Sequence, residues 1–478
     1  MIRTRFAPSP TGYMHIGNLR TAVYEYLIAK SQGGQFILRI EDTDQTRLVE
    51  GSVDVIYNTL KTAGIRHDEG PDIGGAYGPY IQSERKSGYL AFAQQLVAEK
   101  KAYYCFCDKE RLDGLKTPGA KDVAKYDRRC LSLSQEEIDE NLRSNKPYVI
   151  RQLIPEGQTT FSDLVYGDIT VDNAELDDQI LIKSDGLPTY NFANVVDDHL
   201  MLITHVVRGS EYLSSTPKYN LLYTAFGWEI PAYVHLPLVL NENGEKLSKR
   251  KGDASFEDLI AMGFLPEAII NYIALLGWSP SDNTEFFTLD ELVRAFDTKG
   301  LSKSPSVFDK QKLAWMNGEY FKKMDAARFY ALAENTLRDC VKTPGIEPKT
   351  LAPMVQSRIQ FISEIPALLD FIDALPDYDT ALYVHKKMKT TEAIALSSLE
   401  AALPMLAAQT DWTNGGLYAA MIALVETLGV KNGQMLWPVR TALSGKPSSP
   451  CGASELAELL GKEETIRRIT TGIEKLKK

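Results

Sequence analysis

The spacing of apolar and polar residues predicts alternating strands and helices in the first third of the chain. A strand-like run at 5–9 is followed by apolar residues at helical spacing over 19–27, and a second strand-like run follows at 35–42. Gly33 and Gly34 end the predicted helix between them. A helix that joins two strands in this way favours a parallel sheet with right-handed crossovers. Ligands of such sheets bind beyond the carboxyl ends of the strands.

The alternation is interrupted between residues 103 and 189. Short strand-like pieces at 147–151 and 179–183, together with several cysteines and turn residues, replace it there. We interpret this segment as an α+β insertion in the first domain. The alternation of strands and helices resumes over 191–240.

From Ser255 onward nearly every segment has helical spacing, as at 261–278 and 290–296. Beyond Pro344 we expect long amphipathic helices, one of which carries Arg358 and the apolar residues of 359–369. The pattern therefore predicts an α/β half, with a parallel sheet and an α+β insertion, followed by an all-α half.

Composition adds domain number and compartment to this picture. A chain of 478 residues is too long for one core, and about two to four domains are expected. No apolar run approaches the roughly 20 residues that span a bilayer, and the N-terminus passes directly into a strand without a signal-peptide pattern. Five cysteines do not make a disulfide framework in a chain of this size. We therefore expect a cytoplasmic protein with no membrane contact.

The net charge of −10 argues against indiscriminate binding of nucleic acid, but a local basic strip could still meet a specific RNA. Two candidate strips exist, and each could equally be a solvated face. The first is 246–251, and the second consists of Arg467, Arg468, Lys475, Lys477 and Lys478.

The first candidate for chemistry lies between the opening strand and the first helix. His15 and Gly17 fall where that helix begins, and a helix N-terminus attracts anions through its unpaired N–H groups and dipole. Gly12 and Gly17 let the backbone approach a ligand closely. A nucleotide phosphate is the expected guest, and an ordinary structural turn is the alternative.

The second candidate is the loop after a predicted buried strand at 233–240. Lys246, Ser248, Lys249 and Arg250 lie there among glycines. Such a cationic clamp suits a polyphosphate whose charge grows during transfer. A solvated basic turn is the alternative.

Together the two segments resemble the HIGH and KMSKS elements of class I aminoacyl-tRNA synthetases, here His15-Ile-Gly-Asn18 and Lys246-Leu-Ser-Lys-Arg250. Asn18, Leu247 and Arg250 depart from those patterns. Further segments resemble glutamyl-tRNA synthetases of the bacterial type, in the order expected for that family. They are Arg5-Phe-Ala-Pro-Ser-Pro-Thr-Gly12, Arg39-Ile-Glu-Asp-Thr-Asp44, Arg208-Gly-Ser-Glu-Tyr-Leu-Ser-Ser-Thr-Pro217 and Gly433-Gln-Met-Leu-Trp-Pro-Val-Arg-Thr-Ala-Leu-Ser-Gly445.

The resemblance implies that ATP and L-glutamate form a glutamyl-adenylate, which passes glutamate to tRNA(Glu) and leaves AMP and diphosphate, with tRNA required for activation. The glutamate carboxylate itself attacks the α-phosphate, so catalysis consists of positioning and charge stabilisation without a protein nucleophile. His15, Lys246 and Lys249 are the catalytic residues that it implies. Mg²⁺ would arrive with ATP.

The resemblance also assigns binding residues. The glutamate pocket would consist of Arg5, Ala7, Ser9, Glu41, Tyr190, Asn194 and Arg208. The ATP site would consist of His15, Gly17, Glu211, Lys246, Ser248, Lys249 and Arg250. Arg5 would pair with the side-chain carboxylate, which a guanidinium matches bidentately, while Arg208 orders the pocket and Glu41 holds the ammonium. Asp42 and Asp44 could join Glu41 around Mg²⁺, although we prefer them as caps of the next helix.

Cys105-Phe-Cys107 and Tyr126-Asp-Arg-Arg-Cys130 resemble the zinc site of some glutamyl synthetases. A structural zinc ion takes four ligands, so Tyr126 or water would complete the three thiols, Cys105, Cys107 and Cys130. Three packed cysteines without metal are the alternative.

The implied domains are a Rossmann-like catalytic domain at 1–100 and 190–245, an acceptor-end-binding insertion at 101–189, a stem-contact helical domain at 246–322 and a helical anticodon-binding region at 323–478.

A glutaminyl enzyme is disfavoured because its usual tail is a β-barrel. A relative that charges a modified tRNA base lacks an anticodon-binding region, and a catalytically dead RNA-binding paralogue would not need Arg5, His15, Lys246 and Lys249. Whether tRNA(Gln) is also charged stays open, and a monomer is expected from the family.

Overall fold

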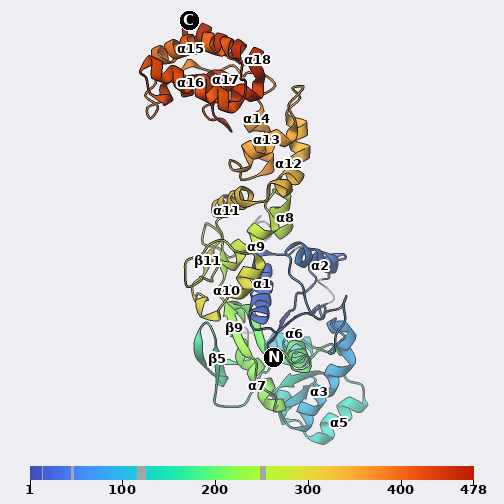
Figure 1. The fold of residues 1–478 in the computed structure, drawn as a ribbon. Coiled ribbons are helices and arrows are strands. Elements are labelled where there is room, and N and C mark those ends of the chain that lie inside the picture. The colour runs from blue at the N-terminus through green and yellow to red at the C-terminus, as the bar shows by residue number, and fades with distance from the viewer. Residues whose placement is uncertain (13, 45–47, 116–124, 248–254) are drawn as a thin grey trace. The chain divides into compact units, whose positions relative to one another are not determined.

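The computed structural model describes residues 1–12, 14–44, 48–115, 125–247 and 255–478 (Figure 1). The chain divides into two compact units, Met1–Lys310 and Gln311–Lys478. None of the described helices combines the length and the apolarity needed to cross a membrane.

The first unit contains every strand of the described chain. Its strands are β1 (Arg3–Phe6), β2 (Gln35–Leu38), β3 (Ala102–Cys105), β4 (Val149–Gln152), β5 (Gln158–Asp163), β6 (Gly167–Asp172), β7 (Ile180–Ile182), β8 (His205–Gly209), β9 (Ala232–Leu236), β10 (Val239–Leu240) and β11 (Ser306–Val307). Its helices are α1 (Ile16–Ser31), α2 (Ser52–Thr62), α3 (Lys86–Ala98), α4 (Lys109–Gly114), α5 (Gln135–Arg143), α6 (Tyr190–Leu200), α7 (Thr216–Phe226), α8 (Phe256–Ala261), α9 (Pro266–Ala274) and α10 (Leu289–Ala295).

The predicted parallel sheet is confirmed. β1 pairs with β2 and β8 pairs with β9, both in parallel. The Thr204 amide donates to the Arg3 carbonyl at 3.0 Å, so the two pairs lie side by side. The carboxyl ends of β1 and β8 are therefore neighbours, which is where a ligand is expected.

The helix α1 is buried on nearly every side because it packs against β1, β2 and β8 and also against α9 and α10. Its apolar residues Leu19, Val23 and Leu27 lie in the core as their spacing predicts. Arg20 and Glu25 on the same helix are also buried, although helical spacing alone would turn them toward solvent.

The interruption between residues 103 and 189 is the predicted α+β insertion. β3, β4 and β7 form an antiparallel sheet, and β5 and β6 form a hairpin whose Asp163 pairs with Tyr233 of β9. The insertion shares a core with α3, α6 and α7, in which Ile150, Phe192 and Leu222 are fully buried.

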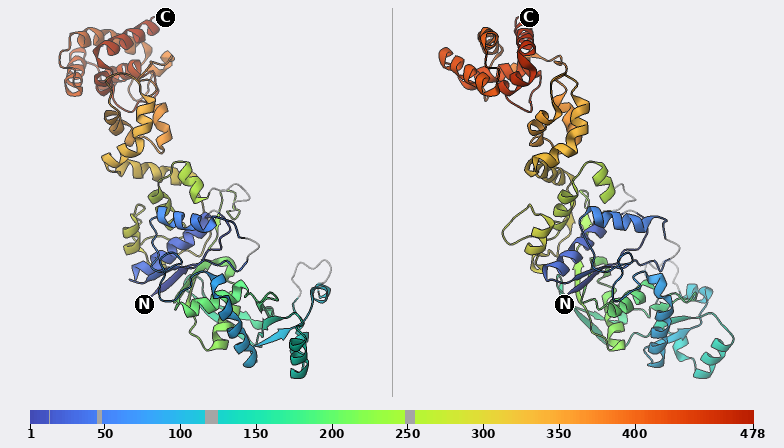
Figure 2. Two further views of the ribbon diagram at one scale, coloured as in Figure 1. Left: turned by 90° about the vertical axis from the view of Figure 1, so that its right-hand side faces the viewer. Right: turned by 45° about the vertical axis from the view of Figure 1, so that its right-hand side comes forward.

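In the second unit, whose residues are all described, helices form without strands. They are α11 (Lys310–Lys323), α12 (Ala326–Cys340), α13 (Pro348–Gln356), α14 (Ile365–Leu369), α15 (Glu392–Ala408), α16 (Asn414–Leu428), α17 (Asn432–Ser444) and α18 (Ala453–Leu476). Figure 2 shows α15–α18, in red, packed on one another from two directions. The prediction of an all-α half is confirmed.

Three local predictions are wrong. A long helix over 359–369 does not form, because a short 3₁₀ turn precedes α14 and Pro366 stands in the first turn of that helix. Arg358 accordingly lies in the turn after α13. The strand expected at 233–240 is split at Pro237, which cannot donate to a strand ladder.

Candidate active site

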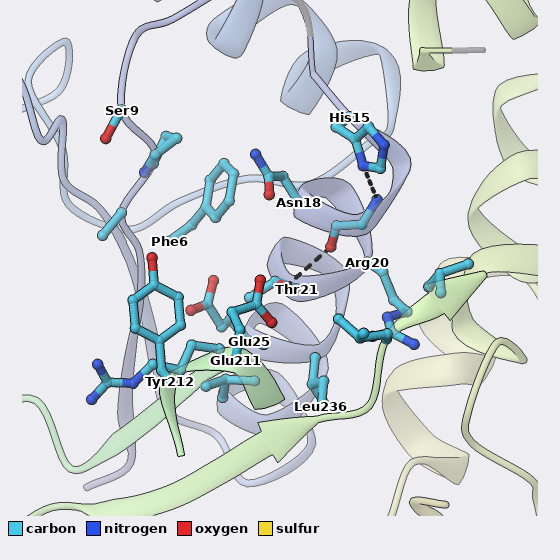
Figure 3. Close-up of a pocket in the computed structure, with 18 of the residues that line it drawn as sticks. Phe6, Ser9, His15, Asn18, Arg20, Thr21, Glu25, Glu211, Tyr212 and Leu236 are labelled. Atoms are coloured by element: carbon cyan, nitrogen blue, oxygen red, sulfur yellow. Dashed lines mark hydrogen bonds between the residues drawn. The ribbon is translucent and has the colours of Figure 1, made fainter. Parts of the chain in front are cut away.

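A cavity of about 280 Å³ opens at the carboxyl ends of β1 and β8, beside the N-terminus of α1 (Figure 3). Of the residues assigned from the sequence, ten line this cavity. They are Arg5, Ala7, Ser9, His15, Gly17, Glu41, Tyr190, Arg208, Glu211 and Lys246. Asn194 of α6 is buried but is not among the lining residues. Ser248, Lys249 and Arg250 lie outside the described residues.

His15 caps α1, as its position in the sequence predicts. Its Nδ1 accepts a hydrogen bond from the Gly17 amide at 3.0 Å (Figure 3), and the backbone at His15 is extended while that of Ile16 is already helical. A neutral ring that accepts at Nδ1 carries its proton at Nε2, where it is a donor. The N-terminus of α1 therefore combines a helix dipole with an imidazole donor, a combination suited to a phosphate.

Arg5 belongs to a buried network of charges. Its Nε donates to Asp198 Oδ1 at 2.9 Å, and Arg39 Nη1 donates to the same oxygen at 2.7 Å. Burial alone would raise the pKa of Asp198, but Arg5 and Arg39 outweigh it and hold that pKa below its usual value. Asp198 is thus an anion that fixes both guanidiniums.

Arg208 differs from Arg5 because it has no carboxylate partner within the described chain. It is enclosed by the rings of Tyr212, Tyr219 and Tyr233, whose centroids lie 5.4, 4.5 and 5.7 Å from its Cζ. Its Nε and Nη1 are buried and make no hydrogen bond to described residues. A buried cation with unfilled donors is a place for an anionic ligand.

Glu41 is already paired in the network. Its Oε1 accepts from Arg39 Nη2 at 2.8 Å, and burial raises the pKa of its carboxyl although Arg39 opposes this.

The capping role preferred for Asp42 and Asp44 is wrong, because the next helix, α2, begins at Ser52 with Gly51 as its N-cap. Asp42 instead accepts from the Ser83 amide at 2.8 Å.

Lys246 and Glu211 form an ion pair of 3.0 Å at the mouth of the cavity. Both side chains are exposed, so the pair contributes little to stability and can open when a ligand competes for the lysine.

The cysteines of the insertion form a second candidate site. The sulfur atoms of Cys105, Cys107 and Cys130 lie within 4.8 Å of one another, and Cys107 Sγ is 3.5 Å from Cys130 Sγ and 3.3 Å from Tyr126 Oη. Thiolates around a tetrahedral zinc ion are about 3.8 Å apart, given a Zn–S bond of about 2.3 Å. Burial raises the pKa of the Cys107 thiol to about 11, and metal binding would release that proton.

A second cavity, of about 920 Å³, lies in the second unit and is lined by Arg358, Trp437 and Arg440 among others. The terminal basic strip predicted from the sequence is not a free cationic face. Arg468 is fully buried and donates to three backbone carbonyls, and Lys475 is paired with Asp377.

The model of class I tRNA synthetases (E and Q), catalytic domain, matches residues 1–315, and an anticodon-binding-domain model matches residues 311–473. A glutamate–tRNA ligase of Clostridium novyi is 61% identical over 100% of this chain and 98% of its own. The chain belongs to the glutamate–tRNA ligase family. A Clostridium botulinum member is 59% identical over 100% of this chain and 99% of its own. The crystal structure of an Elizabethkingia meningosepticum glutamate–tRNA ligase, solved with its amino acid, superposes with a TM-score of 0.86 at 36% identity, covering 99% of both chains.

The structure brings most of the residues inferred from the sequence to one cavity, but sequence patterns did not indicate all of the residues around it. Sequence patterns gave no sign that Asp198 would hold the guanidiniums of Arg5 and Arg39. The tyrosines around Arg208 and the carboxylate of Glu25, which lines the cavity, were also missed. The sequence offers one signal for the burial of Glu25. The helix α1 lies between two predicted strands, so it is expected to pack against a sheet.

Proposed function

We propose that this enzyme uses ATP to join L-glutamate to tRNA(Glu) through a glutamyl-adenylate, giving Glu-tRNA(Glu), AMP and diphosphate. The observation that carries the proposal is Arg208, a buried cation with two unfilled donors, in a cavity that also contains the N-terminus of α1. A carboxylate side chain satisfies Arg208, and a phosphate next to it satisfies the helix end.

On the glutamate side, Arg208 and Arg5 bind the γ-carboxylate. Arg5 is aligned by Asp198, so its guanidinium loses little freedom on binding. Glu41 lies on the same cavity wall and holds the ammonium group. Ala7, Ser9, Tyr190 and Asn194 complete the pocket in this proposal.

On the ATP side, His15 Nε2 and the helix N-terminus bind the phosphates, and Lys246 leaves Glu211 to neutralise the departing diphosphate. Gly17 allows close approach, and Ser248, Lys249 and Arg250 are the remaining members of the site that we propose. The glutamate α-carboxylate is the nucleophile and Mg²⁺ enters with ATP, so the protein contributes position and charge.

Cys105, Cys107 and Cys130 fit a structural zinc ion, with Tyr126 beside them as the fourth ligand. The ion, when bound, would link the end of β3 to the 3₁₀ turn at Arg129–Ser132. It takes no part in the chemistry.

We further propose the division of labour expected from the sequence. Residues 1–100 and 190–245 activate glutamate, 101–189 bind the acceptor end, 246–322 contact the stem and 323–478 read the anticodon. We propose a cytoplasmic monomer, and tRNA(Gln) as a second substrate is a question for experiment.

ATP–diphosphate exchange with L-glutamate, measured with and without tRNA(Glu), tests the chemistry. The proposal predicts exchange that depends on glutamate and on tRNA, and that falls about a hundredfold in Lys246→Ala but is unchanged in Cys340→Ser. The absence of exchange under all conditions would favour a catalytically dead RNA-binding paralogue.

A further inference from the structure

Glu25 is a carboxylate in the cavity that the reaction outlined above does not use. It lies in the middle of α1, is 1% exposed and lines the same cavity as Arg5 and Arg208. Figure 3 shows its side chain among the residues around the cavity, below Thr21. A buried carboxylate at this place would repel the substrate's own carboxylate if it were charged.

The hydrogen bonds of Glu25 are weaker than those of its neighbour Asp198. Asp198 receives two guanidinium donors at 2.9 and 2.7 Å. Glu25 Oε1 receives only Arg5 Nη1 at 3.3 Å, and Oε2 is buried without a partner within the described chain. An ionised buried carboxylate needs donors at both oxygens, whereas a neutral acid needs an acceptor for its one proton.

We propose that Glu25 is a specificity residue that, as a neutral acid, donates a hydrogen bond from Oε2 to the γ-carboxylate of glutamate. This inference rests on the proposed function, because it assumes that glutamate occupies the cavity. Arg5 and Arg208 supply the positive charge, and Glu25 supplies a hydrogen-bond donor.

The surroundings of Glu25 support a shared proton. Two carboxyl groups in contact cannot both ionise readily, so one proton bridges them. Burial, the largest influence, raises the pKa of the Glu25 carboxyl well above its usual value. The charged groups that act on it from the elements packed against α1 are Arg5, Arg39, Glu41 and Asp198, while Arg208 and Glu211 line the same cavity.

The proton also affects the choice between glutamate and glutamine. When Glu25 is neutral, the γ-carboxylate meets two cations and an acid, and binds well. When Glu25 loses its proton, it repels that carboxylate and accepts a hydrogen bond from a glutamine amide. The preference for glutamate over glutamine should therefore stay constant with rising pH while Glu25 is neutral. It should decrease at the pH where Glu25 ionises.

The variant Glu25→Gln tests this, because glutamine is the neutral isostere of a protonated glutamate. We expect the KM for glutamate near neutral pH to stay within about threefold of wild type, since the donor is kept. A folded variant whose KM rises more than about tenfold would overturn the inference, because it would show that Arg5 needs an anion at Glu25.

Infrared difference spectroscopy with ¹³C-labelled glutamate gives an answer that does not depend on turnover. The inference predicts a carboxylic-acid carbonyl band in the glutamate-bound wild type, which shifts in D₂O and disappears in Glu25→Gln. The absence of this band from the wild type would overturn the inference even if Glu25→Gln failed to fold.

Glu69→Gln is the matched control, because Glu69 is a buried carboxylate paired with Arg3 at 2.8 Å but does not line the cavity. It should leave the acid band unchanged. If the wild type fails to charge tRNA(Glu) with glutamate, the proposed function fails. If the wild type charges it and only the predictions for Glu25→Gln fail, the inference alone is wrong.

Discussion

At the scale of single residues, Arg208 allows a role in ligand binding to be distinguished from a role in folding stability. Arg5 and Arg39 are held by carboxylates, and removing one of them would leave Asp198 underpaired. Arg208 has no carboxylate partner among the described residues, and the rings of three tyrosines lie beside it. Its buried charge is retained at a free-energy penalty that folding alone does not explain.

Arg208→Met should therefore separate stability from function. We expect the thermal midpoint to stay or rise, while the KM for glutamate rises about tenfold to a hundredfold, from the loss of a charged hydrogen bond of about 1.5–3 kcal/mol. Thermal unfolding and aminoacylation kinetics check this, with Arg208→Lys as the variant that keeps the charge. A destabilised variant with an unchanged KM would make Arg208 a structural residue.

Lys246 should act on the transition state more than on ATP binding. We expect Lys246→Ala to lower kcat by about a hundredfold, because one donor to the developing charge is lost, and Lys246→Arg to recover part of it. Steady-state diphosphate exchange at saturating ATP measures this. A change confined to the KM for ATP would assign Lys246 to ground-state binding.

Sequence patterns predicted the residues that line the cavity better than those that hold their side chains in place. His15 and Gly17 carry their own signal, a turn followed by a helix, and both lie at the predicted place. Asp198 carries none, because an aspartate on a helix is ordinarily solvated, and only the approach of β1 and β2 brings Arg5 and Arg39 to it. Glu25 was missed for the same reason, since helical periodicity does not reveal a helix covered on several sides.

At the scale of elements, α18 is anchored by charge as well as by apolar packing. Glu464 pairs with Arg467 at 2.6 Å and with the buried Arg468 at 2.6 Å. The hydrogen bond from Arg467, with help from Arg468, lowers the pKa of Glu464 to about 2. Because the folded pKa is depressed, this contribution to stability is present above the unfolded pKa and is lost as the pH falls toward about 2.

Glu464→Gln should lower the free energy of unfolding of the second unit by about 1–3 kcal/mol near neutral pH, since Arg468 Nε loses its carboxylate. The difference between variant and wild type should shrink on acidification. Denaturant titrations at several pH values measure it, with Glu463→Gln on the exposed face of α18 as the control. A difference that is constant with pH would contradict the pairing.

The cluster of Cys105, Cys107 and Cys130 should bind a metal ion, and this binding should depend on these three thiols and not on the other cysteines. We expect about one zinc ion per chain, lost in Cys107→Ser and kept in Cys340→Ser, and a lower thermal midpoint after chelation. Elemental analysis and thermal unfolding check this. Protein that is free of zinc, with all three thiols open to titration, would favour the alternative of packed cysteines.

Element boundaries were predicted less well than element types. Spacing gave α1 correctly because the segment is long and periodic. The helix expected over 359–369 failed because a short apolar run fits a turn as well as a helix, and only the proline at 366 hinted at the break. The strand after residue 233 ends at Leu236, because Pro237 cannot donate a backbone hydrogen bond. Pro237 is visible in the sequence, but the continuous apolar run around it favoured a longer strand.

At the scale of the whole molecule, the chain consists of an α/β unit and a helical unit that each have their own core. The family models divide it at 311–315, close to the structural division after Lys310. With a net charge of −10, the molecule cannot attract RNA by charge alone. Recognition of tRNA must therefore depend on local surfaces, and the finer domain boundaries stay predictions.

The most direct measurement is aminoacylation of purified tRNA(Glu) and tRNA(Gln) with radiolabelled glutamate and, separately, glutamine, in the presence of ATP and Mg²⁺. We expect transfer of glutamate to tRNA(Glu), and transfer to tRNA(Gln) as well would show relaxed reading of the anticodon. Transfer of glutamine, or no transfer to either tRNA, would contradict the proposed function.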